Sequence, residues 1–133
     1  MTQVIDLKTS GGVRRAGAGG DTVVHVGGVP VGPEHLTVIA GPIAVEGEEQ
    51  IRAAGRVVER LGAAILRAGA FQAKASPYEF QGLGETALRL LREAADEAGI
   101  PVLTEVADPR DVGLVVEYIT ISASPAKSGR VAT

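Results

Sequence analysis

Residues 85–105 read ETALRLLREAADEAGIPVLTE, and this stretch decides the fold class. In its first part apolar side chains recur every three or four residues, at Leu88, Leu91, Ala95 and Ala98. This spacing predicts a helix with one apolar side. Gly99 and Pro101 are typical of a helix end, and the apolar run 102–104 that follows predicts a short buried strand. A helix that leads into such a strand is typical of a parallel α/β sheet.

The same alternation occurs upstream, which predicts two more strands and a second helix. Val38-Ile39-Ala40 and Ala64-Ile65-Leu66 are short apolar runs. Between them, the segment from Gly47 to Leu61 carries an apolar stripe at Ile51, Ala54, Val58 and Leu61. Gly62 is the expected end of this helix.

A third helix is expected after the 102–104 strand. Asp108 can cap it by accepting a backbone N–H, and Pro109 suits its first position. Its expected apolar side consists of Val112, Val115, Val116 and Ile119. A fourth strand is expected to begin within residues 119–122.

These elements predict a partial (β/α)₈ barrel preceded by a β-hairpin. The apolar runs 22–26 and 29–31 flank Gly27-Gly28, a typical two-residue hairpin turn. A closed barrel needs about 200–250 residues, and a chain of 133 residues supplies about half of one. We therefore expect a disordered N-terminal segment at 1–20, a partial barrel with its hairpin at 21–121, and a loose tail at 122–133.

Composition excludes several classes of protein. The formal net charge is −3 and no long charged block is present, which argues against a nucleic-acid or membrane-surface partner. The absence of cysteine excludes disulfides and thiolate metal sites within the sequence. Without a signal peptide or a run of about 20 apolar residues, the chain is expected to be cytoplasmic.

The carboxyl ends of the strands are where a ligand site is expected, because parallel α/β folds bind ligands there. Arg67 and Glu105 directly follow two of the apolar runs. Arg67 could grip a phosphate or carboxylate, or it could form a structural pair with Glu105, and position alone favours neither. The long loop 71–84 is either functional or a packed surface loop.

Other polar residues have simpler interpretations. His25 and His35 are expected to be surface or packing residues. Glu46, Glu48 and Glu49 suit the start of a helix through its dipole.

Several blocks of sequence resemble the short bacterial form of 3-deoxy-D-arabino-heptulosonate 7-phosphate (DAHP) synthase, a relative of the 3-deoxy-octulosonate 8-phosphate synthases. The blocks are Ile39-Ala40-Gly41-Pro42, Val45-Glu46, Glu48-Glu49-Gln50, Ile65-Leu66-Arg67, Gly69-Ala70-Phe71, Ser76-Pro77-Tyr78, Phe80-Gln81-Gly82-Leu83-Gly84, Leu90-Leu91-Arg92-Glu93-Ala94, Thr104-Glu105-Val106 and Asp108-Pro109-Arg110-Asp111. The resemblance extends upstream into the hairpin and ends near Tyr118, so residues 122–133 are expected to be a C-terminal tail outside the family pattern. The resemblance implies a transferase of aromatic amino acid biosynthesis that condenses phosphoenolpyruvate with erythrose 4-phosphate in a (β/α)₈ barrel at a divalent metal.

The resemblance assigns roles to three residues. Arg67 matches an arginine that binds phosphoenolpyruvate, and Glu105 matches an acidic catalytic-site residue beside that substrate. Lys74 stands where the family usually has an arginine that approaches the sugar phosphate.

Other positions depart from the family pattern. Ile43 replaces a metal-binding cysteine, so we expect this chain not to bind the metal. Gln72 replaces a lysine that contacts phosphoenolpyruvate, and Ala73 and Ala75 replace its neighbouring Pro and Thr.

These departures, and the change of character after Tyr118, suggest a truncated or frameshifted copy that is inactive alone. Three interpretations stay open: a synthase fragment that works in a homo-oligomer or with a complementary half-barrel, a non-catalytic remnant or interaction module on a complete synthase, and a fragment of the octulosonate type.

Overall fold

A computed structural model describes residues 23–72, 78, 81–119 and 121–123 of the chain. The segment 1–20, expected to be disordered, and most of the expected tail at 122–133 lie outside these residues. No helix within the described ranges is long and apolar enough to cross a membrane.

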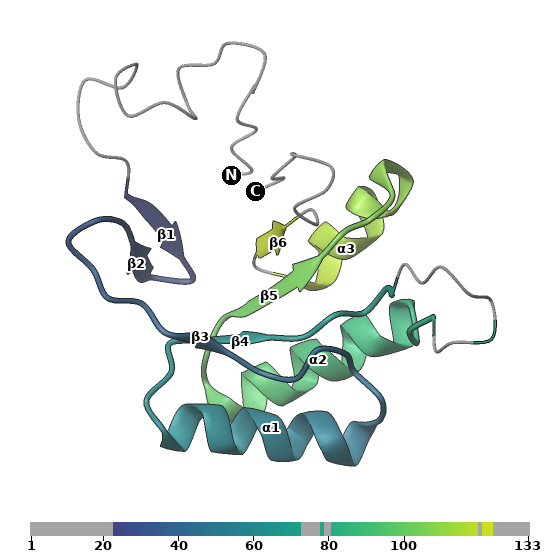
Figure 1. Ribbon diagram of the computed structural model, residues 1–133, viewed down its shortest axis with the longest axis horizontal. Helices are drawn as coiled ribbons and strands as arrows, with labels where there is room; N and C mark the ends of the chain where they lie inside the picture. Colours follow the sequence, from purple (N-terminus) through teal and green to yellow (C-terminus); the bar gives the residue numbers. More distant parts are fainter. Residues whose placement is uncertain (1–22, 73–77, 79–80, 120, 124–133) are drawn as a thin grey trace, which may run out of the picture.

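A four-stranded parallel sheet forms the centre of the α/β fold (Figure 1). Its strands are β3 (Ile39–Ala40), β4 (Ile65–Arg67), β5 (Val102–Glu105) and β6 (Ile121–Ala123). They are hydrogen-bonded in the order β3-β4-β5-β6, and all three pairings are parallel. The predicted strand cores and the expected fourth strand are confirmed, because each short apolar run pairs with the next along the chain.

The predicted helices connect these strands. Helix α1 is Glu48–Arg60 and α2 is Glu85–Ala98, within one residue of the expected bounds. Gly99 ends α2 in the left-handed conformation, as its position predicts. The third helical segment begins with a 3₁₀ turn, Pro109–Asp111, and continues as α3, Val112–Tyr118. The side chain of Asp108 accepts the backbone N–H of Arg110 at 2.9 Å, which confirms the predicted cap.

The core lies between the sheet and its helices. It is built from one face of the strands together with the apolar sides of α1, α2 and α3, and includes Ile51, Val58, Leu66, Leu88, Leu91, Val102 and Val115. Gly55 is also buried, and a Cβ built there would lie 3.2 Å from the carbonyl oxygen of Ala94. The absence of a side chain at Gly55 therefore lets α1 approach α2 closely.

Two members of the expected apolar stripes are not in the core. Leu61 is 79% exposed, because it caps α1 just beyond the last helical residue and does not lie over the packed side. Val116 is 43% exposed, because the short α3 buries its neighbour Val115 instead.

The predicted hairpin forms from β1 (Val24–Val26) and β2 (Val29–Val31), which pair antiparallel. Gly27 and Gly28 have φ values of 52° and 85°, as a two-residue turn of the type I′ class requires. In Figure 1 the hairpin and α1 lie on opposite sides of the sheet. The hydroxyl of Thr37, after the hairpin, donates to the carbonyl of Pro30 at 2.7 Å and ties the following segment to β2.

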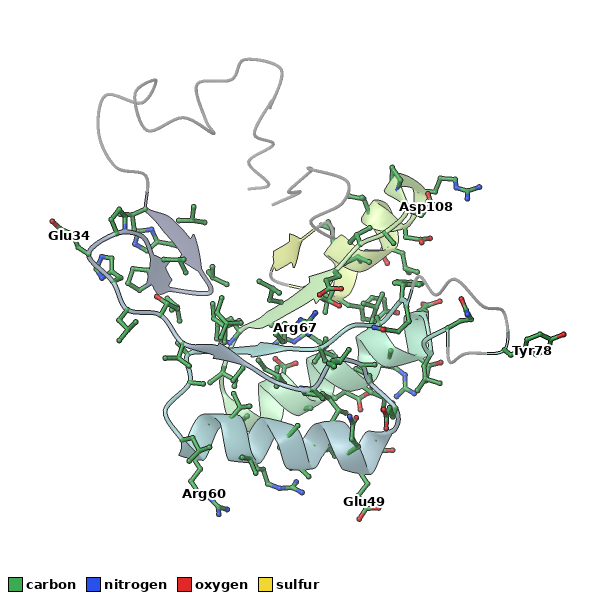
Figure 2. The ribbon with its side chains drawn as sticks, viewed as in Figure 1. Glu34, Glu49, Arg60, Arg67, Tyr78 and Asp108 are labelled. Atoms are coloured by element: carbon green, nitrogen blue, oxygen red, sulfur yellow. The ribbon has the colours of Figure 1, made fainter. Side chains whose placement is uncertain are left out.

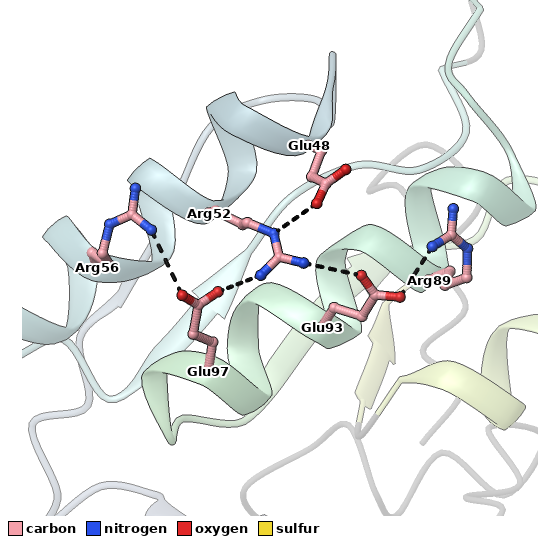
Figure 3. A network of polar contacts seen from close by, with 6 residues as sticks. All are labelled: Glu48, Arg52, Arg56, Arg89, Glu93 and Glu97. Atoms are coloured by element: carbon pink, nitrogen blue, oxygen red, sulfur yellow. Dashed lines mark hydrogen bonds and ion pairs between the residues drawn. The ribbon is translucent and has the colours of Figure 1, made fainter.

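Helices α1 and α2 are also joined by a network of ion pairs on their outer surface (Figure 3). Arg52 is at its centre and pairs with Glu48, Glu93 and Glu97. Arg56 and Arg89 extend it through further pairs with Glu97 and Glu93. The carboxylate of Glu48 thus has a partner within its own helix, in addition to its place in the first turn.

Candidate functional site

The strand register brings Arg67 and Glu105 to the same face of the sheet. Arg67 lies opposite Leu103, and side chains alternate between the two faces of a strand. Leu66, Ala68, Val102 and Val106 belong to the core beneath the helices. Arg67, Leu103 and Glu105 therefore occupy the opposite face, at the carboxyl ends of β4 and β5.

Arg67 and Glu105 form an ion pair through Nη2 and Oε1. Their side chains are 28% and 31% exposed, so the pair is reached by solvent and is not sealed in the core. Figure 2 places Arg67 over the middle of the sheet. Of the two alternatives left open by the sequence, the structure shows the pair between Arg67 and Glu105, with the guanidinium at the strand ends.

Gly41 fixes the backbone beside Arg67. A Cβ built on Gly41 would lie 1.9 Å from the carbonyl oxygen of Arg67, and the φ of Gly41 is +153°. No other residue type fits there without moving the end of β3 away from β4.

The loop after β3 is attached to the segment after β4. The backbone N–H of Gly69 donates to the carbonyl of Ile43, and that of Val45 donates to the carbonyl of Gly69, both at 3.0 Å. Ile43 itself is 73% exposed. The side chain of Ile43 therefore lies near the strand ends and is not packed in the core.

Gln50 holds the same loop, a role that the sequence analysis did not assign to it. Its Nε2 donates to the carbonyl of Ala44 at 3.0 Å, and its Oε1 accepts the N–H of Glu46 at 3.2 Å. The sequence signal was available, because a Gln in the first helical turn can reach back to backbone groups before the helix.

The loop 71–84 is closed at its base by backbone hydrogen bonds. The N–H of Gln72 donates to Gln81 at 2.9 Å, and the N–H of Gly84 donates to Ala70 at 3.1 Å. The side-chain amide of Gln72 donates to the carbonyl of Ile43 at 3.5 Å. The structure thus brings together Gln72 and Ile43, two of the positions that depart from the family pattern.

Other residues that the sequence analysis considered lie outside the described residues or away from Arg67. Lys74, Ala73 and Ala75 fall outside the described residues. Tyr78 is 97% exposed and projects from the periphery, away from Arg67 (Figure 2). His25 and His35 are exposed on and just after the hairpin, which is consistent with surface residues.

The residues present do not fit a divalent metal centre at position 43. Isoleucine has no donor atom, whereas hard or borderline cations need oxygen, nitrogen or thiolate ligands. Among the residues that the structure describes, no group of three or more His, Cys, Asp or Glu could hold a metal ion.

Comparisons of the chain with family models, curated sequences and solved structures all find DAHP synthases or related aldolases. A family model described as "DAHP synthetase I family" matches residues 18–131, which continues past Tyr118, where the recognised motifs end. The chain is 46% identical over 101 residues to a phospho-2-dehydro-3-deoxyheptonate aldolase of Thermotoga maritima. It is 34% identical over 98 residues to a 2-dehydro-3-deoxyphosphooctonate aldolase of Hydrogenovibrio crunogenus.

The chain spans about a third of the length of these relatives. The matches cover 76% and 68% of this chain but 30% and 35% of the two relatives. A crystal structure of the Thermotoga maritima aldolase (DAHP synthase) matches with a TM-score of 0.80 at 40% identity, over 87% of this chain and 34% of that one. A truncated form of the Thermotoga maritima synthase matches with a TM-score of 0.71 at 37% identity, over 83% and 38% of the two chains.

Proposed function

The chain belongs to the DAHP synthetase I family, and from this membership we propose that it supplies the phosphoenolpyruvate-binding part of a 3-deoxy-7-phosphoheptulonate synthase site. Phosphoenolpyruvate carries a phosphate and a carboxylate, two groups that the planar guanidinium of arginine binds with paired hydrogen bonds. The observation that carries the proposal is the partly exposed side chain of Arg67 at the carboxyl end of β4.

Glu105 and Lys74 complete the proposed set. Glu105, paired with Arg67, lies beside the substrate in this proposal. Lys74 approaches the sugar phosphate as a single cation, without the fork of an arginine. In the reaction of the family, the enol carbon of phosphoenolpyruvate attacks the aldehyde of erythrose 4-phosphate, which places two phosphates and a carboxylate close together. Arg and Lys side chains offset this negative charge.

The family's metal has no proposed role in this chain. Residue 43 offers no donor, and the amide at Gln72 adds no charge where the family has a lysine. We therefore expect binding at Arg67 without turnover by these 133 residues alone.

The heptulosonate branch is favoured over the octulosonate branch. Identity is 46% to the heptonate aldolase and 34% to the octonate aldolase. In this proposal the four parallel strands are part of a (β/α)₈ barrel, completed in a homo-oligomer or by a complementary half-barrel. A cytoplasmic location and a place in aromatic amino acid biosynthesis belong to the same proposal, and family membership supports them.

Binding of phosphoenolpyruvate to the 133-residue chain tests the proposal. Isothermal titration calorimetry is expected to show binding by the wild type and a loss of at least about tenfold in affinity in Arg67→Ala. Arg56→Ala is the matched control, because it removes an arginine that pairs with Glu97 on the helix surface. Equal affinity in wild type and Arg67→Ala would reject the proposed role of Arg67.

A product assay tests the expected lack of turnover. Pure chain, phosphoenolpyruvate, erythrose 4-phosphate and Mn²⁺ are expected to give no DAHP, and Ile43→Cys with Gln72→Lys is expected to give none either. Product formation well above background in either protein contradicts this part of the proposal.

A further inference from the structure

The ion pair between Arg67 and Glu105 has a consequence for the binding of any anion at the strand ends. Within the described part of the chain, Glu105 is the carboxylate that pairs with the Arg67 guanidinium. An incoming phosphate or carboxylate seeks the same N–H groups that a carboxylate already accepts from.

The register explains why Glu105 is well placed to compete. Arg67 lies opposite Leu103, so Glu105 is two residues further along β5 toward the carboxyl edge and on the same face. The long arginine side chain reaches toward that edge to meet the carboxylate. An anion that approaches from the edge therefore meets Glu105 together with the guanidinium.

The setting of this pair differs from that of the arginine pairs that join α1 to α2. Arg52 and Arg56 pair with glutamates across the outer surfaces of α1 and α2, where the contacts join two helices (Figure 3). Arg67 and Glu105 are on adjacent strands that are already joined by β-sheet pairing. Because this backbone pairing already holds β4 beside β5, exchange of the ion pair for a bound anion would leave the two strands joined.

We propose that Glu105 acts as a built-in competitor at the Arg67 site, setting a weak affinity for phosphate esters and carboxylates that removal of its charge would raise. This inference rests on the proposed function, because it assumes that Arg67 is the anion-binding residue. It assigns to the charge of Glu105 the role of lowering ligand affinity at that site.

The size of the effect follows from the charge. We consider an anion bound about 6 Å from the Glu105 carboxylate, in an effective dielectric constant of about 40. Repulsion between the two negative charges then lowers the affinity of the anion about tenfold. Replacement by glutamine removes this repulsion and frees the guanidinium while keeping the size of the side chain. We therefore expect Glu105→Gln to bind anions about 5- to 10-fold more tightly than the wild type.

The experiment measures the affinity for phosphoenolpyruvate and, separately, for inorganic phosphate by calorimetry at one fixed salt concentration. Wild type, Glu105→Gln and Arg67→Ala are compared in the full chain. Glu97→Gln is the matched control, because it also removes a carboxylate from an arginine pair, but on the helix surface. If Glu105→Gln does not fold, judged by circular dichroism, Glu105→Ala takes its place with the same expectation.

The outcomes separate this inference from the function on which it rests. Tighter binding in Glu105→Gln, with loss in Arg67→Ala and no change in Glu97→Gln, supports both. Unchanged or weaker binding in Glu105→Gln, with loss in Arg67→Ala, overturns the inference and leaves the function standing, since the charge of Glu105 then does not lower the affinity of the Arg67 site. Undiminished binding in Arg67→Ala overturns both.

Discussion

Replacement of Gly41 by alanine is expected to disturb both the fold and the site. The new Cβ would lie 1.9 Å from the carbonyl oxygen of Arg67 and 2.9 Å from its carbonyl carbon. Both are backbone atoms of β4, so no side-chain rotation relieves the overlap. The end of β3 has to move away from β4 by more than an ångström, against the pairing of Ala40 with Leu66.

The cost has two parts. A close-packed site that receives an extra methyl group loses about 1–3 kcal/mol, and a non-glycine residue at a φ such as +153° loses about 1–3 kcal/mol more. We expect a total of about 2–6 kcal/mol, a large fraction of the usual stability of a domain. At about 4 °C per kcal/mol, this corresponds to a fall of about 8–24 °C in Tm.

Thermal and urea unfolding followed by circular dichroism measure this change, with Gly113→Ala as the matched control. Gly113 lies within α3, and a Cβ there meets nothing within 4 Å. The same substitution there is expected to stabilise the protein by about 0.5–1 kcal/mol. If Gly41→Ala has a Tm within about 2 °C of the wild type, or if both variants are destabilised alike, the steric argument is refuted.

Three further changes test other parts of the structure. The buried hydroxyl of Thr104 donates to the carbonyl of Ala68 at 2.6 Å, so Thr104→Val is expected to cost about 1–2 kcal/mol in urea unfolding. Arg52→Ala is expected to lower Tm because it removes the centre of the network between α1 and α2, and the difference from the wild type should shrink in high salt. Hydrogen bonds from the guanidinium and then the backbone N–H of Arg110 lower the pKa of Asp108 from 3.8 to about 2. Because this folded pKa is depressed, the stabilisation is present above about pH 4 and is lost as the pH falls through about 2. In Arg110→Ala the carboxyl carbon of Asp108 is expected to titrate by NMR at a pH closer to 3.8.

Each of these changes has its own control and contrary result. Thr104→Ser keeps the hydroxyl and Thr104→Ala removes it, and both lose the buried methyl group, so Thr104→Ser is expected to be the more stable of these two variants. Equal losses in Thr104→Ser and Thr104→Ala would contradict the role of the hydroxyl. Arg56→Ala removes one long contact of 3.8 Å and is expected to lower Tm less than Arg52→Ala. An unchanged titration of Asp108 in Arg110→Ala would show that the guanidinium does not lower its pKa.

Local pattern was sufficient to predict most of the secondary structure. The bounds of α1 and α2, the cap at Asp108 and the Gly27-Gly28 turn depend on residues near one another in the chain, so spacing and turn chemistry identify them. The predictions for Leu61 and Val116 were wrong, because periodicity does not show where a helix ends or how much of a short helix is covered.

The candidate site was predicted only in part. Its place at the strand ends follows from the α/β pattern, and the resemblance to a known family assigned Arg67 and Glu105 to it. The same pattern could not decide whether the two residues pair with each other or remain apart.

The sequence by itself determined the order of strands and helices, their caps and the residues that could carry charge at the strand ends. The tertiary structure alone decided which distant residues meet: Arg67 with Glu105, the amide of Gln72 with the carbonyl of Ile43, and Gly41 with the backbone of Arg67. The reason is physical. Capping and periodicity act over a few residues, whereas these contacts depend on the register of parallel strands whose partners lie tens of residues apart.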